Sequence, residues 1–455
     1  MVSDPVHFVK QTSVKSKIGS ICDTVMLMKR RTFLLTAASA QRILGANDRI
    51  NVGLIGCGGR GRYVAGFIRQ APNTSYIAVA DVWRNNADAA RVWAGGDAKS
   101  FSDFRKLLEM KDVDAVHVAT PDHWHASAAI QACQAGKHVF VEKPISFSIH
   151  EGRAMVNAAR RYKRTVYAGT QQRSAPHFAE IADIVQSGKL GKVHYVRVWN
   201  FINMFPKGIG SAPDSPTPDG LDWDMYCGPA PLVPYNKLRH LGTYRWFSDY
   251  SHGYITDYGT HRFDTIHQIM GVERPTTVSA SGGKFALTHI GDVPDTLQVT
   301  YEYPGFIMSY EASNIAGHGL GGRTPGMKYY NTKGDIDRPN GMAFYGTNGV
   351  LFADRVGYEI YPEADRMERV TKQSADATNA HGQAFIAVLR GERKQFADIE
   401  QGHRATSIAL MGSIAYKTGR KLRWDADKEE FIGDRDANQL LARVERKPWG
   451  LPKLK

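Results

Sequence analysis

The sequence predicts a two-domain α/β protein, in which a doubly wound parallel sheet precedes an α+β domain with a large, mainly antiparallel open sheet. Three observations predict this fold class. Between residues 49 and 169, apolar strand-like runs alternate with helical segments, which is typical of a parallel sheet covered on both faces. After residue 172, strand-like runs follow one another with few helices between them, which indicates antiparallel pairing. The length of 455 residues suits two domains, which we place at residues 47–170 and 171–455, after an N-terminal extension of residues 1–46.

The first predicted strand and the first predicted helix enclose a glycine-rich turn. The apolar run 49–55 leads into Gly56-Cys57-Gly58-Gly59-Arg60-Gly61, and a helical pattern follows over residues 62–69. A strand, a GxGxxG turn and a helix in this order form the phosphate site for a dinucleotide. The first glycine makes the tight turn, the second lets the pyrophosphate approach the backbone, and the third lets the helix pack on the strand.

The second predicted strand, residues 76–80, ends at Asp81. A carboxylate at this place binds the adenosine ribose hydroxyls and repels a 2′-phosphate, which favours NAD. Arg84 follows three residues later and leaves NADP open. The glycine turn and Asp81 together predict an NAD(P)-binding Rossmann domain.

The remaining elements are predicted from apolar periodicity. The first domain continues with strands over residues 113–120, 137–142 and 165–169, and with helices over 104–109, 125–136 and 149–162. In the second domain, helices are expected over 177–187, 380–390 and 401–418, and strands over 193–199, 277–280, 296–303, 306–311, 342–346, 350–353 and 358–361. The stretches 203–220 and 314–341, rich in Pro and Gly or in Gly and polar residues, are expected to be long loops.

Two groups of residues are candidates for chemistry. The third strand of the first domain ends in Thr120-Pro121-Asp122-His123-Trp124-His125 and the fourth in Glu142-Lys143-Pro144. Open α/β sheets bind ligands at this carboxyl edge, so Lys143 can hold its charge near a reacting oxygen; a solvated surface lysine is the alternative.

In the second domain, Asp257, His261 and Asp264 have helical spacing. A carboxylate beside an imidazole can raise its basicity and orient it for proton transfer. A helix-terminal carboxylate beside a buried, hydrogen-bonded histidine is the structural alternative. No third ligand at suitable spacing accompanies the pair, so no metal is expected.

Taken together, these motifs resemble the family named after glucose–fructose oxidoreductase, inositol dehydrogenase and the rhizopine-catabolism protein MocA. The resemblance runs from about residue 49 to the C-terminus and rests on GLIGCGGRGR (53–62), Asp81, TPDHWH (120–125), EKP (142–144), TQQRS (170–174) and DYGTHRFD (257–264). The stretches LDWDMYCGPAP (221–231) and ADIEQGHRAT (397–406) are similar to a bacterial, often exported branch of the family.

The resemblance implies roles for the matching positions. Lys143 would be the catalytic lysine beside the nicotinamide, His261 the acid/base that takes the hydroxyl proton, and Asp257 the residue that binds substrate and assists His261. The positions implied to surround the cofactor are Gly56, Gly58, Arg60, Gly61, Asp81, Thr120, Pro121, His125, Glu142, Lys143 and Gln171. The implied substrate-binding positions are Lys143, Arg173, Asp257 and His261. A homo-oligomer, dimer or tetramer, assembled through the open sheet is implied as well.

The combined observations predict an NAD(P)-dependent oxidoreductase that transfers a hydride from a secondary hydroxyl of a sugar, glycoside or cyclitol to nicotinamide. One base and one cationic donor suffice, because the cofactor carries the difficult step. The aromatic residues that could stack on a sugar ring are Trp199, Trp223, Tyr226, Tyr244 and Trp246.

An NAD-dependent glycoside hydrolase that works by transient ring oxidation and elimination is the alternative, and it needs an additional base such as Tyr254, His252 or Tyr258. A nucleotide-binding sensor without turnover is a third interpretation, against which the intact Lys143, Asp257 and His261 argue.

Composition and the N-terminal residues bear on partners and location. Residues 1–46 carry +5 of the formal charge of +13, and the rest is scattered, so nucleic-acid binding is not expected. The four cysteines lack CxxC spacing, so neither a disulfide framework nor zinc is expected. No apolar run reaches the roughly 18 residues needed to span a membrane.

The stretch from Met28 to Ala40 resembles a twin-arginine (Tat) export signal, because Lys29-Arg30-Arg31 precedes a short apolar run. It predicts a periplasmic protein, and a disordered tail on a cytoplasmic protein is the alternative.

Overall fold

The computed structural model describes residues 49–320, 324–331 and 338–454. The predicted export signal and the whole extension 1–46 lie outside the described residues, as do parts of the predicted loop 314–341. Within the described residues, no helix combines the length and the apolar character that crossing a bilayer requires.

The first sheet is parallel throughout and has six strands in the order β3-β2-β1-β4-β5-β6. The strands are β1 (Ile50–Ile55), β2 (Thr74–Ala80), β3 (Lys99–Phe101), β4 (Ala115–Val118), β5 (His138–Glu142) and β6 (Val166–Gly169). The helices between them are α2 (Gly59–Ile68), α3 (Arg84–Ala94), α4 (Phe104–Leu108), α5 (Asp122–Gln134) and α6 (Ile149–Arg161). Strand order reverses between β1 and β4, which opens a crevice at the carboxyl end of the sheet. The predicted doubly wound parallel sheet is confirmed.

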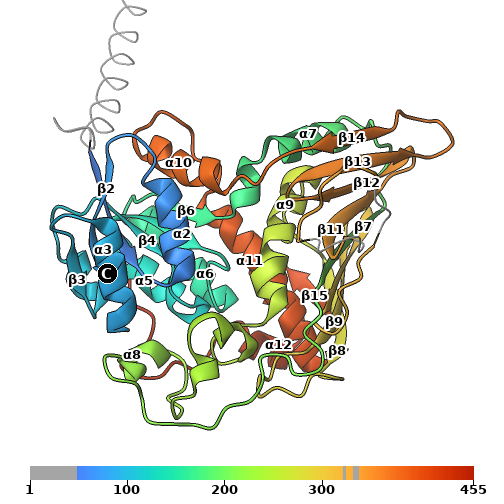
Figure 1. Cartoon of the computed structure of the whole chain (residues 1–455). Helices are drawn as coiled ribbons and strands as arrows, with labels where there is room; N and C mark the ends of the chain where they lie inside the picture. The colour runs from blue at the N-terminus through green and yellow to red at the C-terminus, as the bar shows by residue number, and fades with distance from the viewer. Residues whose placement is uncertain (1–48, 321–323, 332–337, 455) are drawn as a thin grey trace, which may run out of the picture. The chain divides into compact units, whose positions relative to one another are not determined.

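Both faces of this sheet are covered, which explains its nearly continuous apolar strands. The neighbouring residues Ala115 and Val116 of β4 belong to two different apolar clusters, as expected because side chains alternate along a strand. The cluster of Ala115 contains side chains of α2 and α3, and it also contains Phe385 of α10 (Thr378–Leu389). The C-terminal part of the chain therefore supplies a helix that packs beside α2 (Figure 1).

The second sheet has ten strands in the order β14-β13-β12-β11-β7-β10-β9-β8-β15-β16, and all its neighbouring pairs are antiparallel except β7 with β10. The strands are β7 (Tyr195–Phe201), β8 (Thr277–Gly283), β9 (Thr296–Tyr303), β10 (Phe306–Ser313), β11 (Asn340–Tyr345), β12 (Gly349–Asp354), β13 (Gly357–Pro362), β14 (Val370–Gln373), β15 (Leu422–Asp425) and β16 (Glu430–Phe431). One face packs against α7 (Pro176–Gln186), α9 (Thr260–Met270) and α11 (Ile399–Thr418) (Figure 1). Alternate residues of β9 are buried and more exposed, as predicted for a sheet with one open face.

Several elements were not predicted. They are α3, β3, β14, β15, β16 and the short helices α8 (Trp223–Cys227) and α12 (Arg435–Gln439). The buried face of α3 consists of alanines, which give little periodic signal, and the missed strands have two to four residues. The 3₁₀ segments η2 (Gln171–Ser174), η3 (Lys237–Arg239) and η4 (Leu241–Trp246), and the π-helical turn η5 (Ile255–Gly259), were also missed.

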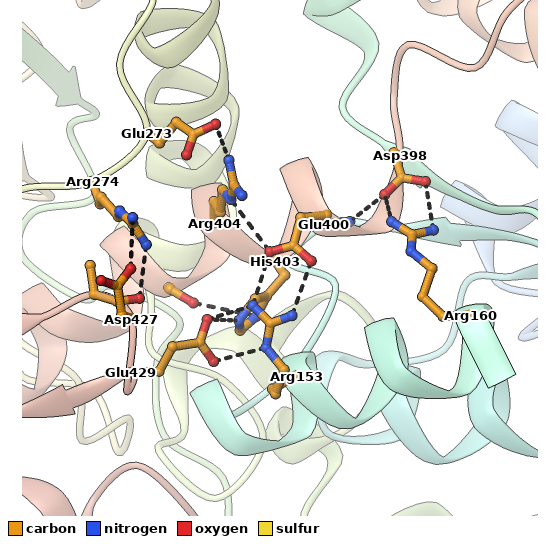
Figure 2. A network of polar contacts seen from close by, with 12 residues as sticks. Arg153, Arg160, Glu273, Arg274, Asp398, Glu400, His403, Arg404, Asp427 and Glu429 are labelled. Carbon is orange, nitrogen blue, oxygen red and sulfur yellow. Dashed lines mark hydrogen bonds and ion pairs between the residues drawn. The ribbon is translucent and has the colours of Figure 1, made fainter.

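A network of ion pairs joins α6 to α11 and to the turn between β15 and β16 (Figure 2). Arg153 of α6 donates two hydrogen bonds to Glu400 of α11, at 2.9 and 3.0 Å, and two to Glu429, at 2.6 and 3.0 Å. The imidazole of His403 lies 2.8 Å from Glu429. Burial alone would raise the pKa of Glu429, but the hydrogen bonds from Arg153 and His403 lower it to about 2. The network thus ties a helix of the first sheet to the C-terminal elements.

Candidate active site

A cavity of about 660 Å³ opens at the carboxyl end of the first sheet. Its lining comes from the glycine turn after β1, from the ends of β2, β4 and β5, and from η4, η5, the start of α9 and the turn after β12. The predicted site residues that line it are Gly56, Gly58, Arg60, Gly61, Asp81, Thr120, Pro121, His125, Glu142, Lys143, Asp257 and His261. The structure therefore brings residues of both predicted domains together around one space.

The glycine turn has room for a phosphate group because of where its glycines stand. Gly56 has a φ of +88°, and a Cβ on Gly61 would lie 2.2 Å from the Gly56 carbonyl oxygen, so the turn and α2 pack closely. A Cβ on Gly58 or Gly59 would meet no atom within 4 Å, and both residues line the cavity. Helix α2 begins here without a side-chain cap or an acidic residue in its first turn. Its first N–H groups and its positive dipole end are therefore available to an anion such as a dinucleotide pyrophosphate.

Asp81 both lines the cavity and holds the glycine turn. Its Oδ2 accepts a hydrogen bond from the Cys57 amide at 2.7 Å, and its Oδ1 accepts one from the Trp83 amide at 2.9 Å. Burial raises the pKa of Asp81. Burial also raises the pKa of the Cys57 thiol, which makes it a poor nucleophile and leaves it a packing role.

The ends of β4 and β5 are held together beside Lys143. The Nε2 atom of His125 lies 2.8 Å from the Thr120 carbonyl oxygen, and its Nδ1 lies 2.6 Å from that of Pro144. Arg60 donates to Glu142 at 3.2 Å. Burial would raise the pKa of Glu142, but the Arg60 charge and the other neighbouring groups lower it to about 2. His125, Thr120 and Glu142 thus position the strand end that carries Lys143.

Lys143 contacts Asp257 through two separate hydrogen bonds. Its ammonium donates to the Asp257 carboxylate at 2.6 Å and to the Asp257 carbonyl oxygen at 2.7 Å. The other carboxylate oxygen of Asp257 lies 3.0 Å from Nε of Arg245. Burial alone would raise the pKa of Asp257, but Arg245 and Lys143 hold it well below its ordinary value. Asp257 is therefore ionised and already engaged by two cations.

His261 is buried at the start of α9 and lines the same cavity. Burial, followed by the charges of Arg355, Lys143, Arg60 and Arg262, lowers its pKa well below the ordinary value. The expectation that the neighbouring carboxylate raises the basicity of His261 is therefore wrong, because burial and the surrounding cations lower the pKa, while Asp257 is paired with Lys143 and Arg245. The imidazole is uncharged near neutral pH and can accept a proton.

Three residues expected near the site are not part of the cavity lining. Gln171 and Arg173 do not belong to the lining of the cavity, and Arg173 donates to Asp264 at 2.7 Å. Their predicted roles in cofactor or substrate binding therefore stay predictions. Asp264 is buried outside the cavity lining, where it accepts the hydrogen bond from Arg173.

The cavity lining includes residues that the motifs did not indicate. Arg245, Tyr330 and Arg355 have no motif of their own, and they reach the cavity only through tertiary packing. Among the aromatic residues considered for stacking, Tyr226, Tyr244 and Trp246 line the cavity, whereas Trp199 and Trp223 do not.

Two of the three residues considered as an additional base reach the cavity. Tyr254 and Tyr258 line it, and burial raises the pKa of both phenols. His252 does not line it, because its two ring nitrogens lie 2.8 Å from the Ser413 hydroxyl and 3.1 Å from the Phe147 carbonyl oxygen. Among the described residues, no group of three or more His, Cys, Asp or Glu side chains is placed to hold a metal ion.

Comparison with known proteins identifies relatives over most of the described chain. The oxidoreductase YrbE of Bacillus subtilis is 28% identical over 298 residues, which cover 64% of this chain and 74% of YrbE. Myo-inositol 2-dehydrogenase of Thermotoga maritima is 24% identical over 246 residues, which cover 54% of this chain and 62% of that enzyme. The solved structure of levoglucosan dehydrogenase in complex with NADH and levoglucosan has a TM-score of 0.62 and 18% identity, covering 82% of this chain and 99% of that one.

Two family models account for both halves of the molecule. The model described as "Oxidoreductase family, NAD-binding Rossmann fold" matches residues 50–170. The model of the C-terminal alpha/beta domain of the same family matches residues 177–305 and 333–451, which is more than half of the chain. The predicted resemblance is thus confirmed, and the chain belongs to the Gfo/Idh/MocA family of NAD-binding oxidoreductases.

Proposed function

We propose that the protein is an NAD(P)-dependent dehydrogenase that oxidises a secondary hydroxyl group of a sugar, glycoside or cyclitol. One observation carries the proposal: Lys143, a cationic donor, and His261, an uncharged imidazole, line the same cavity as the glycine turn. The names of the relatives support this substrate class, because they include a myo-inositol 2-dehydrogenase and a levoglucosan dehydrogenase.

The residues of this chain have only to bind, orient and move a proton, because bound NAD supplies the acceptor for the hydride. Two of the three N–H groups of Lys143 are taken by Asp257, so the third is available to the substrate oxygen. There it stabilises the negative charge that develops as the hydroxyl proton leaves. His261 accepts that proton as the general base.

Asp81 supports NAD as the preferred cofactor. Its carboxylate lines the cavity at the end of β2, next to the glycine turn. In this position it hydrogen-bonds ribose hydroxyls and repels the 2′-phosphate of NADP.

The test is the reduction of added NAD by a panel of sugars, glycosides and cyclitols, followed as NADH absorbance. We expect at least one to reduce NAD with the wild-type protein and none to do so with Lys143→Ala. If no member of the panel yields NADH, and Lys143→Ala behaves like the wild type, the proposal is lost.

The specific observation that favours a second function is the pair of tyrosines in the cavity. Tyr254 and Tyr258 have ring centroids 5.0 Å apart and both line the cavity, where the phenolate of either would remove a ring proton after oxidation. Burial raises the pKa of both phenols, so this step is expected to be favoured at high pH. An NAD-dependent glycoside hydrolase would then eliminate the aglycone and reduce the ring again. Release of aglycone from a nitrophenyl glycoside without net NADH supports hydrolysis, whereas NADH formation in step with product supports dehydrogenation.

We further propose a domain division at residue 170, export by the Tat-type signal around Met28–Ala40, and a homo-oligomer formed through the open sheet. The paired arginines before a short apolar run support export, with a cytoplasmic location as the alternative. The alternating exposure along β9 supports an oligomer. Mass spectrometry of the protein from periplasmic and cytoplasmic fractions, under native and denaturing conditions, tests the location, the cleavage site and the number of subunits.

A further inference from the structure

The part of the cavity around His261 holds more positive than negative charge. Lys143 and Arg245 share the one carboxylate of Asp257, at 2.6 and 3.0 Å. A third cation, Arg355, stands on the turn between β12 and β13 and also lines the cavity. Its ion pair is with Asp376, whose nearer oxygen is 3.8 Å away, which is longer than a hydrogen bond.

A fourth cation near this region, Arg262, has guanidinium nitrogens without a hydrogen-bond partner among the described residues. Arg262, next to His261 in α9, is buried, and its Nη1 and Nη2 atoms have no hydrogen-bond partner in the described part of the chain. Burial, together with the charge of Arg355, lowers the pKa of Arg262 to about 10. The charge of Asp354 favours the charged form of Arg262, but its carboxylate accepts its hydrogen bonds from the amides of Tyr330 and Val356, at 2.9 and 2.8 Å. Among the described residues, neither Arg262 nor Arg355 thus has a carboxylate at hydrogen-bond distance.

The Arg355 guanidinium is held in a position from which it can bind a ligand. It lies over the ring of Tyr330, 4.7 Å from the centroid, and Tyr330 lines the cavity as well. Its side chain is 14% exposed, so it is largely shielded from bulk water. A guanidinium in such surroundings forms strong paired hydrogen bonds with a planar carboxylate. Arg355 and His261 both line the cavity, and the charge of Arg355 contributes to the lowered pKa of His261.

We propose that Arg355 binds a carboxylate group of the substrate, so that the enzyme prefers a sugar acid to the corresponding neutral sugar. The inference rests on the proposed dehydrogenase function and names the substrate class for the same site. A carboxylate compensates the positive excess left by Arg355 and Arg262, which a neutral sugar leaves uncompensated.

The experiment compares sugars that differ only in the charged group. D-glucuronate is paired with D-glucose and D-galacturonate with D-galactose, and glucose 6-phosphate tests a different anion. NADH formation gives kcat/KM for each, and calorimetric titration into protein saturated with NADH gives binding without turnover. We expect the acid of at least one pair to exceed its neutral partner about tenfold or more in kcat/KM and in affinity.

Two matched variants assign the preference to one guanidinium. Arg355→Gln is expected to reduce the ratio of acid to neutral kcat/KM to about one, mainly through KM, and Arg355→Lys to restore only part of the preference. Arg369→Gln is the control, because Arg369 lies over Tyr361 at 4.8 Å in a comparable stack but does not line the cavity. The ratio of acid to neutral kcat/KM of the Arg369→Gln variant should equal that of the wild type.

The outcomes separate this inference from the function on which it rests. The inference is overturned if the acid and its neutral partner have equal kcat/KM and equal affinity in every pair. It is also overturned if neither member of any pair binds in calorimetry. A preference for glucose 6-phosphate over both acids overturns it too. If neutral sugars form NADH in a Lys143-dependent way and as well as the acids do, the inference fails while the dehydrogenase function stands. If no sugar of the full panel forms NADH, the function fails, and calorimetry still decides whether Arg355 binds carboxylates.

Discussion

Lys143 donates to Asp257 twice, to the carboxylate at 2.6 Å and to the main-chain oxygen at 2.7 Å. The first residue follows β5 and the second belongs to η5, so these bonds fix the end of the parallel sheet against the helical segment that carries His261. The bond to the main chain directs the ammonium even without the carboxylate. Lys143 and the helical segment that precedes His261 are thus held together by this pair of bonds.

Replacing Lys143 is expected to remove catalysis while leaving nucleotide binding nearly intact. Lys143→Met should lower kcat by about 10²- to 10³-fold, because the developing negative charge on the substrate oxygen loses its donor. Steady-state rates and NADH fluorescence titration measure the two effects. Lys137→Met is the control, since Lys137 donates to the Met110 carbonyl oxygen and does not line the cavity. A Lys143→Met enzyme with wild-type kcat would contradict the assigned role.

His261 is expected to set the acid limb of the pH–rate profile. It must be uncharged to accept a proton, so activity falls as pH drops through its pKa, which burial and neighbouring cations place well below 6.5. The wild-type profile should therefore stay level through pH 6.5. Removing a positive charge by Arg355→Gln should raise the pKa of His261 and move the limb to higher pH. His261→Gln should lower kcat about 10²- to 10⁴-fold and abolish the limb; a profile that breaks near pH 6.5 in the wild type would argue against this environment.

We expect the glycines of the turn to have two different roles: some leave room for the dinucleotide, and others let the turn pack closely against α2. Gly58→Ala should fold normally but weaken NADH binding about tenfold or more, because its methyl group occupies open space in the cavity. Gly61→Ala should lower the free energy of unfolding by about 2 kcal/mol, because its Cβ would lie 2.2 Å from the Gly56 oxygen. Gly66→Ala, in α2 with no atom within 4 Å of its added Cβ, is the control and should not destabilise. Urea unfolding and fluorescence titration distinguish the three variants.

Asp81→Ser is expected to change cofactor preference. The wild type should use NAD better than NADP, and the variant should lose much of this difference because the repulsion of the 2′-phosphate is gone. Affinity for NADH should also fall, since Asp81 holds the Cys57 and Trp83 amides. The ratio of kcat/KM for the two cofactors is the measurement, and an unchanged ratio would show that another group selects the cofactor.

The sequence was most informative where function follows from local order along the chain. The GxGxxG turn, Asp81 and Lys143 each follow a strand directly, so their common edge could be predicted from strand alternation alone. Arg245 and Arg355 could not be predicted, because η4 and the turn after β12 carry no motif and reach the cavity only in three dimensions. Arg173 was predicted to contact the substrate because it lies close to a motif in the sequence. Its side chain instead donates to Asp264, because closeness to a motif does not fix the direction of a side chain.

Arg153 is expected to stabilise the protein at neutral pH and less so in acid. Arg153→Gln should lower the free energy of unfolding by about 2 kcal/mol at pH 7, because Glu400 and Glu429 then face each other without their shared cation. The folded-state pKa of Glu429, about 2, lies below its ordinary value of 4.5, so its contribution is complete above pH 4.5 and is lost as pH falls toward 2. The difference between variant and wild type should shrink accordingly in urea titrations at decreasing pH. Arg274→Gln, which breaks the exposed pair with Asp427, should change stability little at any pH.

The π-helical turn Ile255–Gly259 has a consequence for how this enzyme can diversify. One residue more or less in that turn would rotate Asp257 against His261 by about 100° while the helix itself persisted. Under the proposed mechanism, a change in the length of this turn would separate the Lys143–Asp257 contact from His261, whereas substitutions at constant length would keep both at the cavity. We therefore expect new specificities to arise by substitution, or in the loops that close the other sides of the cavity.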